Sequence, residues 1–395
     1  MSDFLMADLP DGPFVRLANL LNGVEPAKPS ITMAVGDPQG EVPAFITEAL
    51  VRETASFGKY PAANGTEGWR LAASSWISRR FGLPASFIHP DKHVLPLNGS
   101  REGLFLSLFP LMPKTKAGGR PAVAMPNPFY QAYAAAALAA GAEPIYVPAT
   151  ADNGFLPDYD ALPHSVLERL VAVYICSPSN PEGAVADADY WHRLFALAQT
   201  HDFVVLADEC YADIYYGDPP ASALTARFAA TGGLSRLLSF HSLSKRSGLP
   251  GLRSGLVAGD AALLARFRAF RNVAAPTVPT PVLAASTAAW NDEAHVEANR
   301  ARYVERMAAA QTILGNRMTR PNGAMFLWLD VGNGEKFALR AWREQGIRLL
   351  PGAYMGREYL PGKTQSNPGF SYVRVALVND LSTIRAALER LKEIL

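Results

Sequence analysis

Between about residues 46 and 280, short apolar runs alternate with longer stretches of helical periodicity. Each run is four to eight residues long, is bounded by turn residues and is apolar on both faces, which is typical of a strand covered on both sides. Strands that alternate with helices predict an α/β fold with a mostly parallel sheet wound with helices. The six predicted strands are Pro121–Met125, Pro144–Val147, Leu170–Ser177, Phe203–Ala207, Leu237–Phe240 and Gly255–Ala258.

The pattern changes on either side of this region, and a chain of 395 residues has room for two domains. The first 45 residues are rich in proline and glycine and predict an irregular arm, which we expect to join the smaller domain. After Pro281 a long helical stretch is expected over residues 282–318, and Asp380 is the predicted N-cap of a closing helix. The expected parts are an arm over 1–45, a large α/β domain over 46–280 and a small α+β domain over 281–395.

Charge and composition exclude several classes of function. The 37 Lys and Arg residues nearly balance the 36 Asp and Glu residues, whereas a nucleic-acid-binding surface usually needs a basic excess. The longest uncharged runs, Pro121–Ala142 and Asn272–Asn291, are broken by prolines, so no membrane span is expected. The N-terminal segment lacks the basic start of a signal peptide, and Cys176 and Cys210 form neither a zinc motif nor a disulfide framework. We therefore expect a cytoplasmic protein that binds neither nucleic acid, membrane nor metal.

Chemically versatile side chains follow the predicted strands. Ligands of doubly wound sheets bind outside the carboxyl ends of the strands, so these side chains are expected to converge there. They lack metal-ligand spacing, and the absence of a GxGxxG motif speaks against a nicotinamide oxidoreductase. The converging set comprises Tyr130, Asn180, Asp208, Tyr211, Ser242, Ser244, Lys245 and Arg253.

This set of groups matches the chemical needs of pyridoxal 5'-phosphate. A lysine forms a Schiff base with the cofactor aldehyde, and a carboxylate keeps the pyridine nitrogen protonated so that the ring acts as an electron sink. Hydroxyls, an arginine and the backbone N–H groups of a helix start can hold the phosphate. An aromatic ring can stack on the cofactor, and an amide and a phenol can bind its ring oxygen.

The ordered motifs resemble those of the class I/II, fold type I pyridoxal-phosphate aminotransferases. The resemblance extends over nearly the whole chain, from Ala34–Pro38 to Val373–Val375. Each motif is weak alone, whereas the set in this order is specific. The motifs are Tyr60 with Gly65, Asn98-Gly-Ser100, Tyr130, Asn180-Pro-Glu-Gly183, Asp208-Glu-Cys-Tyr211, Ser242-x-Ser-Lys245 with Arg253, and Arg374.

The resemblance implies a role around the cofactor ring for five of these residues. Lys245 would be the Schiff-base lysine and the proton shuttle, and Asp208 would pair with the pyridine nitrogen. Tyr211 and Asn180 would bind the ring oxygen, and Tyr130 would stack on the ring. Lys245, Asp208 and Tyr211 are therefore the implied catalytic residues.

The resemblance also implies how the phosphate is held. Tyr60 would reach the phosphate of the neighbouring subunit, which implies a homodimer with shared active sites. The other ligands of the phosphate would come from the same chain: two serine hydroxyls, one guanidinium and two backbone N–H groups at a helix start. These implied phosphate ligands are Ser242, Ser244, Arg253 and the backbone of Ser100 and Arg101.

The implied reaction moves an amino group between an amino acid and a 2-oxo acid. Arg374 would bind the substrate α-carboxylate as a bidentate fork, with Gly36 and Asn180 close by. Among these enzymes the chain most resembles the succinyldiaminopimelate aminotransferases of lysine biosynthesis, with N-succinyl-diaminopimelate and 2-oxoglutarate as the candidate pair. The motifs behind this closer resemblance are Pro126–Tyr133, Leu350–Tyr354 and Asn367–Gly369.

Three alternatives remain open at this point. Arg357 is a candidate for binding a remote carboxylate, but a loop arginine facing solvent is the alternative. A C–S β-lyase of the same fold would carry an almost identical set of residues. A regulator that uses the fold without catalysis would need an N-terminal DNA-binding domain, for which the arm before Ala34 is too short.

Overall fold

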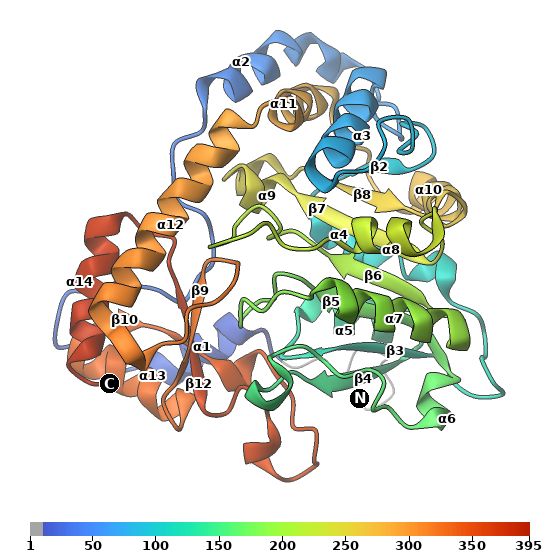
Figure 1. Cartoon of the computed structure of the whole chain (residues 1–395). Coiled ribbons are helices and arrows are strands. Elements are labelled where there is room, and N and C mark those ends of the chain that lie inside the picture. The colour runs from blue at the N-terminus through green and yellow to red at the C-terminus, as the bar shows by residue number, and fades with distance from the viewer. Residues whose placement is uncertain (1–10) are drawn as a thin grey trace.

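The computed structural model describes residues 11–395 and is built around a seven-stranded sheet (Figure 1). The strand order is β2-β8-β7-β6-β5-β3-β4, and β8 alone runs against its two neighbours. The predicted α/β fold with a mostly parallel sheet is therefore confirmed. The strands are β2 (Val94–Leu97), β3 (Ala122–Asn127), β4 (Glu143–Pro148), β5 (Leu170–Cys176), β6 (Val204–Asp208), β7 (Leu237–Ser242) and β8 (Gly255–Gly259).

All six predicted strands are present, with ends that shift by at most two residues. Within the seven-stranded sheet, the strand that the sequence did not predict is β2, a four-residue segment that contains Pro96. A proline lowers the expectation of a strand because it cannot donate to the ladder, but it is tolerated at a sheet edge. Strand β2 is such an edge, since it pairs only with β8.

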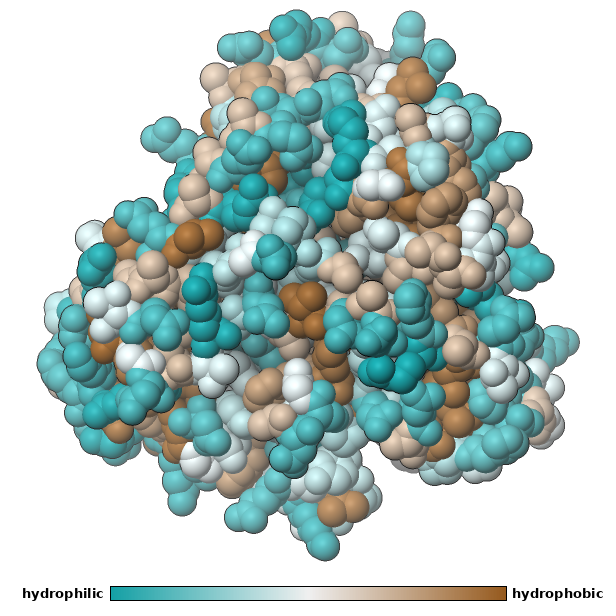
Figure 2. Space-filling view, viewed as in Figure 1, coloured by the Kyte–Doolittle hydropathy of each residue, from teal (hydrophilic) through white to brown (hydrophobic). Residues whose placement is uncertain are grey.

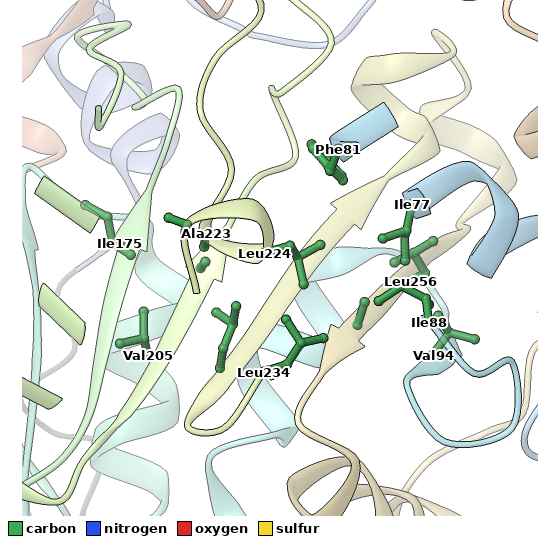
Figure 3. Close-up of a cluster of buried hydrophobic side chains, with 14 of the residues drawn as sticks. Ile77, Phe81, Ile88, Val94, Ile175, Val205, Ala223, Leu224, Leu234 and Leu256 are labelled. Carbon is green, nitrogen blue, oxygen red and sulfur yellow. The ribbon is translucent and has the colours of Figure 1, made fainter. Parts of the chain in front are cut away.

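Helices cover both faces of the sheet, and every residue of β5, β7 and β8 is buried. On one face Ile77 and Leu224 pack with Val205 and Leu256 of the strands (Figure 3). Local signals define helix ends, as at Thr66, whose side chain accepts a hydrogen bond from the N–H of Trp69. The helices of this part are α3 (Glu67–Phe81), α4 (Ser100–Leu106), α5 (Gln131–Ala139), α6 (His164–Leu167), α7 (Ala188–His201), α8 (Ala223–Thr231), α9 (Leu243–Arg246) and α10 (Ala261–Ala274).

The C-terminal part forms a separate antiparallel sheet with the order β11-β12-β9 and its own apolar core. Where one helical stretch was expected over 282–318, two helices occur, because Asp292 accepts a hydrogen bond from the N–H of His295 and starts a second helix. Asp380 is confirmed as the N-cap of the closing helix, since it accepts from the N–H of Thr383. The elements are α11 (Thr280–Asn291), α12 (Ala294–Leu314), β9 (Phe326–Asp330), α13 (Gly334–Gln345), β10 (Ile347–Arg348), β11 (Leu350–Pro351), β12 (Tyr372–Ala376) and α14 (Leu381–Lys392).

The N-terminal arm is more regular than expected, although its first ten residues lie outside the described part of the chain. It contains helix α1 (Pro13–Leu21) and strand β1 (Ile31–Thr32), which pairs with β10, and α2 (Ala44–Arg52) follows it. Proline suits the first turn of a helix, and the apolar face of α1 packs beside β11 and α13. The prolines and glycines thus flank ordered elements in place of an irregular arm.

Helix α12 runs diagonally along the left side of Figure 1, from near α11 in the upper part to α14 beside the small sheet. Hydrophilic residues cover most of the outer helices on this face, and apolar residues appear in smaller patches (Figure 2). Within residues 11–395, no helix combines the length and the apolarity that crossing a membrane requires.

Candidate active site

A cavity of about 380 Å³ lies at the carboxyl ends of β3, β5, β6 and β7, where β9 and β12 of the small sheet also reach it. It is lined by all the residues predicted for the site except Tyr60 and Arg357. The sheet topology explains this convergence, because parallel strands bring their following loops to one edge. The predicted residues that line the cavity are Gly36, Ser100, Arg101, Tyr130, Asn180, Asp208, Tyr211, Ser242, Ser244, Lys245, Arg253 and Arg374.

Lys245 lies on the short helix α9, which begins directly after β7. Ser242 ends the strand and caps this helix by accepting a hydrogen bond from the N–H of Ser244. The Lys245 ammonium donates to the carbonyl oxygen of Gly36 at 2.5 Å. Burial lowers the pKa of Lys245 from 10.5 to about 8, so about a tenth of the amine is neutral and nucleophilic at pH 7.

Asp208 ends β6 with its carboxylate buried below the cavity. Its Oδ2 atom accepts a hydrogen bond from the Tyr133 hydroxyl at 2.6 Å, and its Oδ1 atom accepts from the backbone N–H of Cys210 at 3.3 Å. Burial raises the pKa of Asp208. No cation within the described residues forms an ion pair with this carboxylate that would offset the effect. A cation placed beside this carboxylate would therefore be stabilised.

Tyr133 is a site residue that sequence reasoning did not assign. It lies on α5, three residues after the N-cap residue Tyr130, and its ring stacks on Tyr174 with centroids 4.4 Å apart. The spacing of three residues was the available signal, since it places both rings on one helix face. Whether that face meets Asp208 depends on packing that the sequence does not display.

Arg253 lies beside the N-terminus of α4, next to Ser244. Its Nη2 atom donates to the carbonyl oxygen of Asn98 at 3.2 Å, and its Nη1 atom donates to that of Pro250 at 3.0 Å. Gly99 makes this approach feasible, because a Cβ atom at this position would overlap the guanidinium. The guanidinium, the Ser244 hydroxyl and the helix start together form a seat for an anion.

Arg374 enters the cavity from β12 and is buried. It donates from Nη1 to the Asn180 side-chain oxygen at 2.9 Å and from Nη2 to the Ala34 carbonyl oxygen at 2.7 Å, whereas its Nε atom has no hydrogen-bond partner in the described chain. Burial lowers the pKa of Arg374 to about 10, so the guanidinium is still cationic at neutral pH. A buried cation with an unused N–H group suits a carboxylate ligand.

Aromatic side chains shape the walls between these polar groups. Arg101 donates a short hydrogen bond from Nε to the Tyr130 hydroxyl. The ring of Tyr211 meets that of Phe326 edge-on, with centroids 5.9 Å apart. Gly36 passes so close to Phe326 that a Cβ atom would lie 2.6 Å from the ring, which explains a glycine there.

The two remaining predicted residues lie elsewhere. Tyr60 is fully exposed on the surface of the chain. Arg357 is half-buried beside a second cavity, with its guanidinium carbon 5.9 Å from the ring centroids of Phe129 and Tyr146. Two hydrogen bonds with the Asn127 side chain hold the backbone of Arg357.

The cavity includes further residues that the sequence analysis did not assign to the site. Both cysteines line it, and burial raises the pKa of each thiol. The unassigned residues that contribute most to its walls are Phe14, Asp37, Tyr133, Cys176, Cys210 and Phe326.

The donor set fits pyridoxal 5'-phosphate. A partly neutral buried amine, a buried carboxylate without a cation, and an anion seat beside a helix start are the groups that this cofactor needs. Gly99 lets the Arg253 guanidinium approach this helix start closely, because a Cβ atom there would overlap it.

Comparison with known proteins identifies one family across the chain. A family model described as aminotransferase class I and II matches residues 28–391. The chain is 34% identical to the 4-dedimethylamino-4-oxo-anhydrotetracycline transaminase OxyQ of Streptomyces rimosus, over 91% of this chain and 92% of that protein. It is 30% identical to an LL-diaminopimelate aminotransferase of Dehalococcoides mccartyi, over 88% of this chain and 86% of that one.

Solved structures show the same similarity in three dimensions. An aminotransferase from Neisseria meningitidis superimposes with a TM-score of 0.93 at 36% identity, covering 99% of both chains. A probable N-succinyldiaminopimelate aminotransferase from Thermus thermophilus gives a TM-score of 0.82 at 26% identity, covering 97% of this chain and 100% of that one. These similarities confirm both the predicted resemblance and the fold type I architecture.

Proposed function

The chain belongs to the class I and II aminotransferases, which depend on pyridoxal 5'-phosphate, and we propose that the cavity described above is its active site. The observation that carries this proposal is the convergence of the Lys245 amine, the Asp208 carboxylate and the Arg374 guanidinium on one cavity. These three groups come from separate elements, and an amine, a buried carboxylate and a buried guanidinium are what amino transfer requires.

Each group has a proposed task in holding the cofactor. Lys245 would attach it through Nζ, and Asp208 would face its ring nitrogen. Ser244 and Arg253 would bind the phosphate together with Ser242 and the backbone N–H groups at the start of α4. Tyr130 would stack on the ring, while Tyr211 and Asn180 would bind the ring oxygen.

When bound, the cofactor supplies an electron sink that acidifies the substrate Cα–H bond. Lys245 would take up this proton on Nζ and give it back, because a pKa of about 8 lets the amine exist in both forms near neutral pH. Arg374 would hold the substrate α-carboxylate with the N–H groups that face the cavity, which fixes the orientation of the Cα–H bond. Asp208 stays ionised when a cation faces it, since burial destabilises its charge only while it is unpaired.

For the substrates, we propose N-succinyl-diaminopimelate as amino donor and 2-oxoglutarate as acceptor. Relatives named for LL-diaminopimelate and N-succinyldiaminopimelate support an amino acid with a second carboxylate. The direct test is to incubate the purified enzyme with this pair and to measure glutamate formation. Release of pyruvate and ammonia from a cysteine-type substrate, without glutamate formation, would instead identify a β-lyase.

We propose a homodimer in which Tyr60 of each chain completes the other chain's phosphate site. In support, Tyr60 and Phe57 are large aromatic side chains on one segment, and both are mostly exposed in the single chain. Exposed apolar side chains that gather on one segment commonly mark a surface that another chain covers. We further propose a cytoplasmic location, because Cys176 and Cys210 are both free thiols, which suits a reducing compartment.

A further inference from the structure

Four cationic side chains line the cavity: Arg101, Lys245, Arg253 and Arg374. The proposed function uses the last three, for cofactor attachment, phosphate and α-carboxylate. It uses only the backbone of Arg101. The guanidinium of Arg101 is therefore the one cation that the described cavity holds without a task.

The neighbourhood of Arg101 leaves this charge uncompensated. Its Nε atom is engaged by the Tyr130 hydroxyl, and its guanidinium carbon lies 5.6 Å from the centroid of the Tyr130 ring. Within residues 11–395, no carboxylate forms an ion pair with it. The adjacent Glu102 is unavailable, because it accepts from Arg271 at 2.9 Å and from the N–H of Asn98 at 2.6 Å.

The acidic groups of the cavity do not neutralise Arg101 either. Asp208 is held by Tyr133 and Cys210, and Asp37 makes no ion pair within the described chain. The hydrogen bond to Tyr130 restrains the Nε edge of the guanidinium, while both terminal nitrogens have no partner among the described residues. Two parallel N–H groups on a restrained plane are the arrangement that binds a carboxylate in bidentate fashion.

We propose that Arg101 determines substrate specificity by binding a second carboxylate of the substrate, remote from the one at Arg374. This inference rests on the proposed function and deepens it. Arg101 reaches the cavity from helix α4 and Arg374 from β12 of the small sheet, so the two cations come from different parts of the fold. A dicarboxylic substrate would place one carboxylate at each. The sequence-based candidate for this task, Arg357, is among the residues that line a second cavity and not among those that line this one.

The test compares two acceptors of equal length, 2-oxoglutarate and 2-oxopentanoate, which lacks the second carboxylate. Arg101→Gln removes the charge and keeps the backbone at the helix start. The Arg101 side chain is exposed, so water competes for the carboxylate and the gain from one charged hydrogen-bonded pair is reduced. We expect the ratio of the KM for 2-oxoglutarate to the KM for 2-oxopentanoate to rise about 5- to 30-fold, equivalent to ~1–2 kcal/mol.

Arg101→Lys and Arg357→Gln complete the series. Lysine keeps the positive charge but lacks the planar guanidinium with its two parallel N–H groups. Arg101→Lys should therefore retain more of the preference for 2-oxoglutarate than Arg101→Gln does. An equal rise in both KM values for Arg101→Gln would show that Arg101 acts only through Tyr130 and would overturn the proposal. A selective rise in Arg357→Gln but not in Arg101→Gln would overturn it as well.

A binding experiment separates this inference from the proposed reaction. Calorimetry on the holoenzyme measures the affinity for glutarate and for pentanoate, without any turnover. We expect the wild type to prefer glutarate and Arg101→Gln to lose this preference, even if the amino-transfer assay fails. Equal affinities for the two acids in the wild type would refute the role of Arg101 independently of the reaction.

Discussion

At the scale of single residues, the most telling quantity is the pKa of Lys245. Burial lowers it from 10.5 to about 8. At a pH between these two values, Lys245 of the folded protein is mostly neutral, whereas an ordinary lysine is mostly charged. Only the neutral amine attacks an aldehyde. We expect the rate at which cofactor-free protein takes up pyridoxal 5'-phosphate to rise about tenfold per pH unit below pH 8 and to level off above it.

Visible absorbance in a stopped-flow instrument measures this uptake. Lys245→Ala is the control, because it should bind the cofactor without forming the borohydride-sensitive band. A rate that continued to rise up to pH 10.5 would contradict the lowered pKa.

Tyr133 offers a second prediction at this scale. Tyr133→Phe removes the hydroxyl that donates to Asp208 at 2.6 Å, and the pKa of Asp208 should rise because this hydrogen bond lowers it. A less strongly ionised Asp208 holds the ring nitrogen less firmly, so kcat should fall about 5- to 20-fold, corresponding to ~1–2 kcal/mol. The isotope effect of an α-deuterated substrate should grow, since proton abstraction is the step affected.

Tyr174→Phe is the matched control for this prediction. Tyr174 is equally buried and stacks on Tyr133, but its hydroxyl donates to the carbonyl oxygen of Leu104 at 2.6 Å and not to Asp208. Both variants lose one buried hydrogen bond, worth about 1 kcal/mol of stability. If Tyr174→Phe lowers kcat as much as Tyr133→Phe does, the effect reflects general loosening of the core and not the carboxylate.

At the scale of elements, the junction that leads into α4 forms the proposed phosphate seat. Gly99 has a φ of +84°, and a Cβ atom there would overlap the Arg253 guanidinium. Gly99→Ala should therefore lower the free energy of unfolding by about 1 kcal/mol and weaken cofactor affinity by about tenfold or more, because the guanidinium is displaced. Equilibrium dialysis with pyridoxal 5'-phosphate and chemical denaturation measure the two effects.

Gly82→Ala separates the two effects of that change. Gly82 ends α3 with a φ of +64°, and a Cβ atom there would meet nothing within 4 Å. It should show a comparable loss of stability with unchanged cofactor affinity. The idea of a seat at α4 would be wrong if both variants bound the cofactor equally well.

The elements also show where prediction from sequence succeeds and where it stops. Strand β5 was predictable because all its residues are buried, which makes it a continuous apolar run. Strand β2 was missed because Pro96 is acceptable only at a sheet edge, and edge position is a property of the whole sheet. Helix α1 was missed because the prolines and glycines around it indicated an irregular segment. Its short apolar face, Leu17 and Leu21, packs on the small sheet.

At the scale of the whole molecule, the candidate site was largely predictable from the order of motifs. Residues after parallel strands must meet at one edge, so Tyr130, Asn180 and Lys245 were expected together. The contact between Arg374 and the Ala34 carbonyl joins residues 340 positions apart, and no local pattern encodes it. Which cavity Arg101 and Arg357 each line likewise depends on tertiary packing.

The final prediction concerns assembly. If Tyr60 completes the partner's phosphate site, each active site needs Lys245 from one chain and Tyr60 from the other. A mixed dimer of Tyr60→Ala and Lys245→Ala chains then contains one intact site and one doubly defective site. Random exchange of equal amounts makes half of the dimers mixed, so about a quarter of the wild-type activity should return.

Two weakly active or inactive preparations are mixed, allowed to exchange and assayed against each preparation alone. Sedimentation at the assay concentration shows whether dimers are present. Phe57 supplies a control, because it is also exposed on the same segment, and Phe57→Ala mixed with Lys245→Ala weakens the interface without removing the hydroxyl. A fully active monomer, or no recovery where mixed dimers form, would show that each chain builds its site alone.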